Sequence, residues 1–145
     1  MARDTTTGGA YEEIVATVIR RSCQQRGYVA ERQVNVGKKP GGGNHVVDWE
    51  LTELSNPDRK ALISCKTQNT SGTAEEKLAY EAIKLLHAME QDSRYTHAWI
   101  VMGGTGWSDG MVTFAKENLP RWVPAAVGRL TVITTDELIT RGIQF

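Results

Sequence analysis

Residues 46–68, VVDWELTELSNPDRKALISCKTQ, contain two runs rich in apolar and β-branched residues, separated by the polar segment 55–58. This pattern predicts two strands joined by a turn. Because side chains alternate along a strand, Asp48 and Glu50 are expected on one face of the first strand. Its other face is expected to hold the apolar residues Val47, Trp49 and Leu51. The second strand is expected to present its polar side chains on one face: Ser64, Lys66 and Gln68.

Length and composition favour one globular domain spanning residues 1–145. The chain has 40% hydrophobic residues, enough to bury a core at this length. The charges of its 17 basic and 17 acidic residues cancel, so a nucleic-acid partner would have to bind to a local basic patch on the surface. Cys23 and Cys65 are expected to be small apolar fillers rather than a disulfide or metal pair. No apolar run approaches the roughly 20 residues of a membrane helix and no signal segment is evident, so we expect a cytoplasmic protein without membrane contact.

Outside the hairpin, hydrophobic periodicity predicts an alternation of helices and strands. Helices are expected to end at Gly27, to start with a capping box at Thr73 and Glu76, and to end the chain from Thr135 to Gly142. A short helix around residues 111–115 should be stopped by the Leu119-Pro120 pair. The other predicted strands are residues 28–36, 98–102 and 130–133. This order implies an α/β fold in which helices flank both faces of a mixed central β-sheet.

Two glycine-rich segments are candidates for DNA contact. Residues 37–45, GKKPGGGNH, are too rich in glycine to hold a fixed shape, and they form either an ordinary flexible loop or a mobile basic arm that closes on phosphates. The candidate DNA-binding residues of this arm are Lys38, Lys39, Asn44 and His45. In the second segment, 103–110, Trp107 either stacks on a base or packs under its own loop. This segment lacks the Gly-Lys-Ser/Thr ending of a P-loop, so no nucleotide cofactor is expected. The other tryptophans are expected in the core: Trp49, Trp99 and Trp122.

The polar face of the hairpin suggests metal-dependent chemistry. Mg²⁺ prefers oxygen ligands and usually takes one or two carboxylates together with waters and phosphate oxygens. Asp48 and Glu50, beside a strand that carries Lys66, offer part of such a shell. A metal ion lowers the pKa of a bound water, and a lysine can steady the hydroxide or the phosphate under attack. The simpler alternative is an ordinary cross-strand ion pair.

The segments VDWE, 47–50, and ISCKTQ, 63–68, resemble the PD-(D/E)xK pattern, in which an Asp on one strand is followed across a hairpin by an acidic-x-Lys triplet. The chain is similar to this superfamily from its first helix through the strand at 98–102. The segments 72–77 and 103–107 also resemble phage and restriction-type members. The resemblance implies a restriction-endonuclease-like core and cleavage of DNA with Mg²⁺, for which Mn²⁺ can substitute.

The chain departs from the pattern at two positions. Val47 replaces the proline before Asp48, and Ser64 stands where the triplet should have its acidic residue. In similar restriction enzymes a Ser-x-Lys triplet is rescued by a glutamate on the following helix. Helical projection places two glutamates beside the buried stripe of that helix. The metal-ligand candidates besides Asp48 are therefore Glu75, Glu81, Glu50, and Glu12 or Glu13 on the first helix, where related enzymes carry an outer ligand.

The resulting prediction is a Mg²⁺-dependent DNA endonuclease of the restriction or phage type. Asp48 would hold the metal and Lys66 would activate the attacking water, while Ser64 fills the acidic position of the triplet. Gln68 would orient the phosphate or the lysine, or simply end the strand. One site per chain implies a homodimer for cutting both strands. The alternatives are a Holliday-junction resolvase, a DNA-binding module whose site has decayed, and a protein-interaction domain with an ion-paired hairpin.

Overall fold

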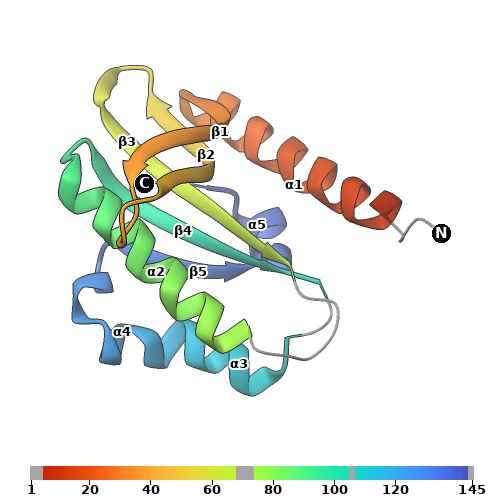
Figure 1. The fold of residues 1–145 in the computed structure, drawn as a ribbon. Helices are drawn as coiled ribbons and strands as arrows, with labels where there is room; N and C mark the ends of the chain where they lie inside the picture. The colour runs from red at the N-terminus through yellow and green to blue at the C-terminus, as the bar shows by residue number, and fades with distance from the viewer. Residues whose placement is uncertain (1–4, 68–73, 105–106, 144–145) are drawn as a thin grey trace.

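The structure is a computed structural model that describes the backbone of residues 5–67, 74–104 and 107–143, and the side chains of these residues except 5–11 and 74–76. Figure 1 shows a sheet with helices on both of its faces. The elements in chain order are α1 (Thr5–Arg26), β1 (Tyr28–Lys38), β2 (Asn44–Glu53), β3 (Asn56–Thr67), α2 (Ala74–Gln91), β4 (Tyr95–Gly103), α3 (Asp109–Thr113), a π-helical turn (Phe114–Asn118), α4 (Leu119–Trp122), a 3₁₀ turn (Pro124–Ala126), β5 (Leu130–Thr134) and α5 (Thr135–Arg141).

The five strands form one mixed sheet in the order β1-β2-β3-β4-β5. The first three strands are antiparallel neighbours, whereas β3, β4 and β5 run parallel to one another. Parallel neighbours need crossover connections, and α2 supplies the one between β3 and β4. The predicted α/β fold with a mixed central sheet is confirmed.

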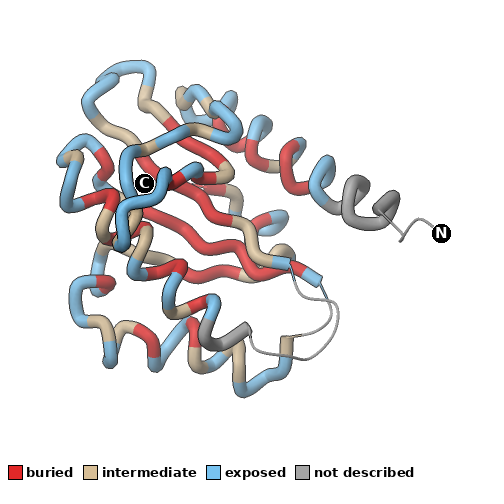
Figure 2. The backbone as a smooth tube through the Cα atoms, viewed as in Figure 1, coloured by how far each residue is buried: buried red, intermediate tan, exposed pale blue. Residues whose placement is uncertain are grey.

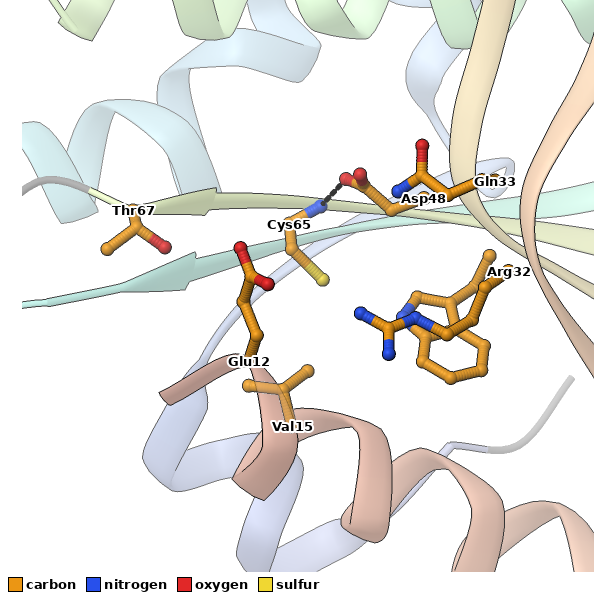
Figure 3. A pocket seen from close by; sticks show the side chains of 8 residues that line it. Glu12, Val15, Arg32, Gln33, Asp48, Cys65 and Thr67 are labelled. Atoms are coloured by element: carbon orange, nitrogen blue, oxygen red, sulfur yellow. Dashed lines mark hydrogen bonds between the residues drawn. The ribbon is translucent and has the colours of Figure 1, made fainter. Parts of the chain in front are cut away.

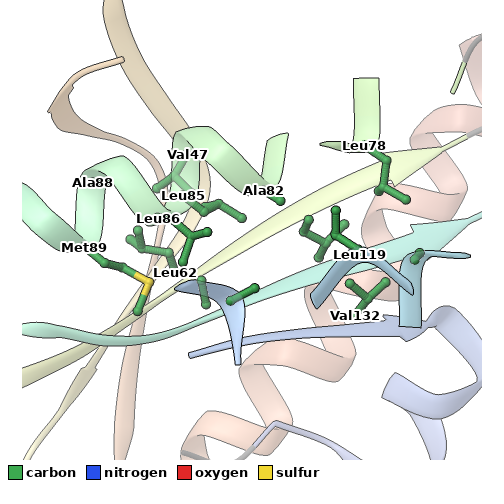
Figure 4. Close-up of a cluster of buried hydrophobic side chains, with 14 of the residues drawn as sticks. Val47, Leu62, Leu78, Ala82, Leu85, Leu86, Ala88, Met89, Leu119 and Val132 are labelled. Atoms are coloured by element: carbon green, nitrogen blue, oxygen red, sulfur yellow. The ribbon is translucent and has the colours of Figure 1, made fainter. Parts of the chain in front are cut away.

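Each face of the sheet has its own hydrophobic cluster. The α2-side cluster lies under α2 and the segment from α3 to the 3₁₀ turn (Figure 4). It consists of Val47, Leu62, Leu78, Ala82, Leu85, Leu86, Ala88, Met89, Tyr95, Ala98, Ile100, Met102, Ala115, Leu119, Ala126 and Val132. The α1-side cluster lies under α1 and α5 and consists of Val15, Ala16, Ile19, Cys23, Trp49, Leu51, Ala61, Ile63, Trp99, Val101, Ile133, Leu138 and Ile143. The central strands are therefore buried on both sides (Figure 2). Among the described residues, no helix is both long and apolar enough to cross a membrane.

Three local predictions are wrong. The β2–β3 turn is tighter than residues 55–58, because Glu53 already pairs with Asn56. The helix after β4 does not stop at Leu119-Pro120 but continues as α4, since a proline in the first helical turn needs no backbone hydrogen bond. Trp122 at the end of α4 is 72% exposed rather than part of the core.

The glycine-rich segment 37–45 has a defined shape, contrary to the prediction of a loop without one. The Lys39 N–H donates to the Gly43 carbonyl at 2.8 Å, and the Tyr80 hydroxyl of α2 donates to the Pro40 carbonyl at 3.3 Å. Gly41 and Gly42 have positive φ angles, which favour glycine. The glycines therefore permit a tight hairpin tip that lies against α2.

Candidate active site

The Asp48 carboxylate lies where β2 separates from β3. The pairing of these strands runs back along β2 as far as Trp49, opposite Ile63. Beyond that point Asp48 Oδ2 accepts a hydrogen bond from the Cys65 N–H at 2.7 Å, so a side chain takes the place of a backbone acceptor. On the other side, Gln33 of β1 hydrogen-bonds to the same carboxylate and has a φ of 55°. Such a backbone angle is uncommon outside glycine and marks a strained position.

This irregularity interrupts the alternation of β2. Val47 packs in the α2-side cluster, whereas Trp49 and Leu51 pack in the α1-side cluster. The prediction that these three residues share a face is therefore wrong. The physical reason is that alternation holds only along a regularly paired strand, and β2 leaves β3 at Asp48.

The triplet lysine contacts a buried glutamate of the next helix. Lys66 Nζ lies 2.9 Å from Glu81 Oε1, and Lys84 Nζ lies 3.0 Å from the same oxygen. Glu81 is 4% exposed and Ser64, on the same face of β3 as Lys66, is 2% exposed. Burial by itself would raise the pKa of Glu81, but the two ammonium groups outweigh it and hold that pKa below its ordinary value. The structure thus brings an ionised carboxylate to Lys66 from α2.

Asp48, Lys66 and Glu81 form one electrostatic group. Burial raises the pKa of Asp48, and the Cys65 N–H and the Lys66 ammonium only partly offset it, while the negative charge of Glu81 raises it further. A divalent cation would relieve both the burial of these carboxylates and their mutual repulsion.

Glu50 belongs to a different set of contacts. Its Oε2 accepts a hydrogen bond from the Tyr95 hydroxyl at 2.6 Å, and its Oε1 lies 3.3 Å from Lys60 Nζ. Burial and the adjacent carboxylate both raise the pKa of Tyr95, so the hydroxyl keeps its proton. Glu50 shares a strand with Asp48, but it is 8% exposed and both of its oxygens have partners from β3 and β4.

A small pocket opens on the α1 side of Asp48. Its volume is about 100 Å³, and Figure 3 shows Glu12 of α1 and Arg32 of β1 pointing into it from two sides. Its lining consists of Glu12, Val15, Arg32, Gln33, Asp48, Trp49, Cys65 and Thr67. Of the two glutamates considered on the first helix, Glu12 lines this pocket. Glu13 has a side chain that is 68% exposed and lies 3.6 Å from Arg32.

The residues proposed to contact DNA are spread over two places. Lys38 donates to Asn44 at 2.7 Å within the hairpin tip, next to Lys39. His45 is 3% exposed and close enough to Glu81, Lys84 and His87 of α2 to feel their charges, so the expectation that it contacts DNA does not fit its burial. Trp107 packs against the α2-side cluster and donates its indole N–H to the Gly103 carbonyl. Gln68 lies outside the described residues, as do Thr73 of the capping box and the side chains of Glu75 and Glu76.

The carboxylates suggested as metal ligands do not all come together. Within residues 12–67, 77–104 and 107–143, no three side chains of His, Cys, Asp or Glu are arranged to hold a metal ion. Asp48 and Glu81 nevertheless fit Mg²⁺, since this ion is usually bound by one or two carboxylates and keeps several waters. The donor set around Asp48 is thus compatible with a hard divalent cation.

Sequence reasoning missed two cationic residues of the site. Lys84 is three residues from Glu81 on α2, a spacing that brings helical side chains together, so it could have been found. Arg32 lies 16 residues before Asp48, and nothing in the sequence around it distinguishes it from other surface arginines.

Comparison with known protein families assigns most of the chain to one described family. A family model described as a PD-(D/E)XK nuclease superfamily domain matches residues 7–141, which include the hairpin, α2 and the whole sheet. No curated protein sequence matches the chain closely enough to count as a relative. The matched range includes Asp48 on β2 and Lys66 on β3 of the five-stranded mixed sheet. The chain therefore belongs to the PD-(D/E)XK nuclease superfamily.

Proposed function

We propose that the protein is a single-domain, Mg²⁺-dependent DNA endonuclease of the restriction or phage type, acting in the cytoplasm of a bacterial, archaeal or phage-infected cell. Membership of the superfamily supports a nuclease-type function on nucleic acid, and its members generally use divalent metals. The observation that carries the proposal is the 2.9 Å contact between Lys66 and the buried Glu81, beside Asp48.

Asp48 and Glu81 are the proposed metal ligands. Glu81 supplies the carboxylate that Ser64 cannot, whereas both oxygens of Glu50 have structural partners. When bound, the divalent ion would lower the pKa of a water and take up charge on the leaving oxygen. The hydrogen bond from Cys65 fixes the orientation of the Asp48 carboxylate.

Lys66 is the proposed catalytic lysine. Its ammonium positions the attacking water and interacts with the phosphate. Lys84 contacts the same oxygen of Glu81, so Glu81 keeps a counter-charge when Lys66 turns toward the substrate. A single site per chain implies that a homodimer, or two successive nicks, cuts a duplex.

The test is incubation of supercoiled plasmid with and without Mg²⁺, followed by separation of nicked and linear products. Lys66→Ala should abolish cleavage and retain DNA binding. Lys60→Ala is the matched control. Lys60 also lies on β3 and contacts a buried glutamate, but that glutamate is Glu50 and not Glu81. Wild-type cleavage by Lys66→Ala would reject the assignment.

Two alternative functions can be distinguished with the same purified protein. A Holliday-junction resolvase would cut a four-way junction in preference to a linear duplex offered beside it. A decayed DNA-binding module is favoured by one observation, the serine in the acidic position of the triplet. That module would bind DNA but show no cleavage in a titration with Mg²⁺ or Mn²⁺.

A further inference from the structure

The guanidinium group of Arg32 is held beside the proposed catalytic carboxylate by a buried tryptophan. Its Cζ atom lies 5.1 Å from the centre of the Trp49 ring, a distance typical of cation–π contacts. Trp49 is only 3% exposed, so the surface under the guanidinium is fixed by the core. In Figure 3 the Arg32 side chain extends toward Cys65 within the pocket that also contains Asp48.

The ion pair of Arg32 does not use up its hydrogen-bonding capacity. Arg32 lies 3.6 Å from Glu13, which is longer than a charge-assisted hydrogen bond, and the Glu13 side chain is 68% exposed. Exposed pairs of this kind contribute about 0–1 kcal/mol. A guanidinium has five N–H donors in a fork that matches phosphate oxygens. Because the Arg32 side chain is itself 34% exposed, an incoming phosphate can replace Glu13.

The charges around the pocket are arranged asymmetrically. Asp48 and Glu12 line it as carboxylates and would repel a nucleic-acid backbone, whereas Arg32 provides a positive charge in the same lining. For a backbone with one phosphate near Asp48, Arg32 offsets this repulsion at an adjacent phosphate. Phosphate contacts of this kind fix the register of a nucleic acid on a protein without reading its sequence.

We infer that Arg32, stacked on Trp49, binds a backbone phosphate next to the one that is cleaved. The inference rests on the proposed nuclease function and adds a phosphate-binding subsite to it. Arg32 is a substrate-binding residue in this scheme, and the site for the metal lies with Asp48 and Glu81.

Arg20 provides a matched control. Its Cζ atom lies 5.5 Å from the same Trp49 ring, but Arg20 comes from α1 and does not line the pocket. A variant of Arg20 therefore removes a similar cation–π contact and one positive charge without touching the proposed subsite.

The experiment measures binding of a short DNA duplex in EDTA over a range of salt concentrations for the wild type, Arg32→Gln, Arg32→Lys and Arg20→Gln. Arg32→Gln should bind about tenfold more weakly and reduce the slope of log K against log salt by about 0.9, the value for one phosphate contact. Arg32→Lys should keep the slope but show most of the same tenfold loss of affinity, since lysine keeps the charge without the fork. Arg20→Gln should match the wild type in both quantities.

The inference is overturned if Arg32→Gln binds with wild-type affinity and slope, or if Arg20→Gln produces the same change. Should Arg32→Gln fail to fold, an unchanged affinity of Arg32→Lys overturns it instead. Because binding is measured without metal, the outcome is distinct from that of the cleavage assay. Normal cleavage by Lys66→Ala would reject the catalytic proposal while leaving the phosphate subsite to be judged by its own salt slope.

Discussion

The choice between Glu50 and Glu81 as the second acidic residue gives opposite predictions for two conservative substitutions. Glu50→Gln removes the charged acceptor of the Tyr95 hydroxyl and the counter-charge of Lys60, whose side chain is only 15% exposed. A hydrogen bond to a charged group contributes about 1.5–3 kcal/mol, so the substitution should cost about 2–3 kcal/mol of unfolding free energy. For a chain of this length that loss corresponds to a fall in Tm of roughly 5–10 °C.

Glu81→Gln should have the reverse balance of effects. Lys66 and Lys84 lose a shared counter-charge, but their side chains are 36% and 21% exposed, so water can solvate both ammonium groups in part. The unfolding free energy should therefore fall by only about 1 kcal/mol. Cleavage should fall by at least about 100-fold, since a metal ion supplies several kcal/mol of transition-state stabilisation. The rise in Tm that Mg²⁺ causes in the wild type should shrink in this variant.

The assays are thermal unfolding followed by circular dichroism, with EDTA or Mg²⁺, and initial rates of plasmid cleavage at a temperature well below both Tm values. The expected result is a Glu50→Gln protein that is less stable but active, and a Glu81→Gln protein that is nearly as stable but inactive. The reasoning is refuted if Glu50→Gln loses cleavage with an unchanged Tm while Glu81→Gln cleaves at the wild-type rate.

Three further substitutions test the electrostatics of the fold. Burial raises the pKa of Asp48, which means that its negative charge is unfavourable in the folded protein. Asparagine removes that charge and keeps an acceptor for the Cys65 N–H, so Asp48→Asn should raise Tm in EDTA and abolish cleavage. A lower Tm would contradict this. Both ring nitrogens of buried His45 are without a hydrogen-bond partner among the described residues. His45→Phe should therefore raise the unfolding free energy, measured with urea, by about 1–3 kcal/mol. A lower unfolding free energy would show that water hydrogen-bonds to the ring. Burial tends to raise the pKa of Glu137, but Lys116 and the Thr134 N–H hold that pKa below its ordinary value of 4.5. This carboxylate therefore stabilises the protein above pH 4.5, and the stabilisation is lost as pH falls through the lowered pKa. Glu137→Gln should therefore cost about 1 kcal/mol at pH 7 and flatten the dependence of stability on pH below about 4.5; an unchanged dependence would contradict the assignment.

The regular parts of the fold could be predicted because local rules governed them. Along β3, Leu62 lies on the α2 side and Ile63 on the α1 side, as alternation requires. This strand is paired with both β2 and β4 from Lys60 to Ile63 and with β4 onward to Thr67, so its side chains have no freedom to change face. Helical projection of α2 likewise identified Glu81 as a side chain that can look toward the sheet, and Lys66 meets it there.

The remaining features depend on contacts between distant parts of the chain. Glu50 is engaged by Tyr95, 45 residues later, which no periodicity in the sequence indicates. Where β2 leaves β3, Asp48 is hydrogen-bonded by Gln33, whose positive φ is not expected from its residue type. The hairpin tip at Gly41 and Gly42 shows a third limit, since composition predicts flexibility wherever glycines are frequent but does not indicate which turn they make.

The burial of Ser64 offers a physical reason for the altered triplet. Ser64 is 2% exposed on the face of β3 that α2 covers, and Glu81 reaches that face from α2 with 4% exposure. A carboxylate at position 64 would add a further buried negative charge to the group that already contains Asp48 and Glu81, and like charges oppose each other's ionisation. A small neutral side chain avoids this conflict and leaves room for the glutamate of the helix to meet Lys66. Serine in the strand and glutamate in the helix are thus two parts of one arrangement, so the serine alone does not indicate that the site has decayed.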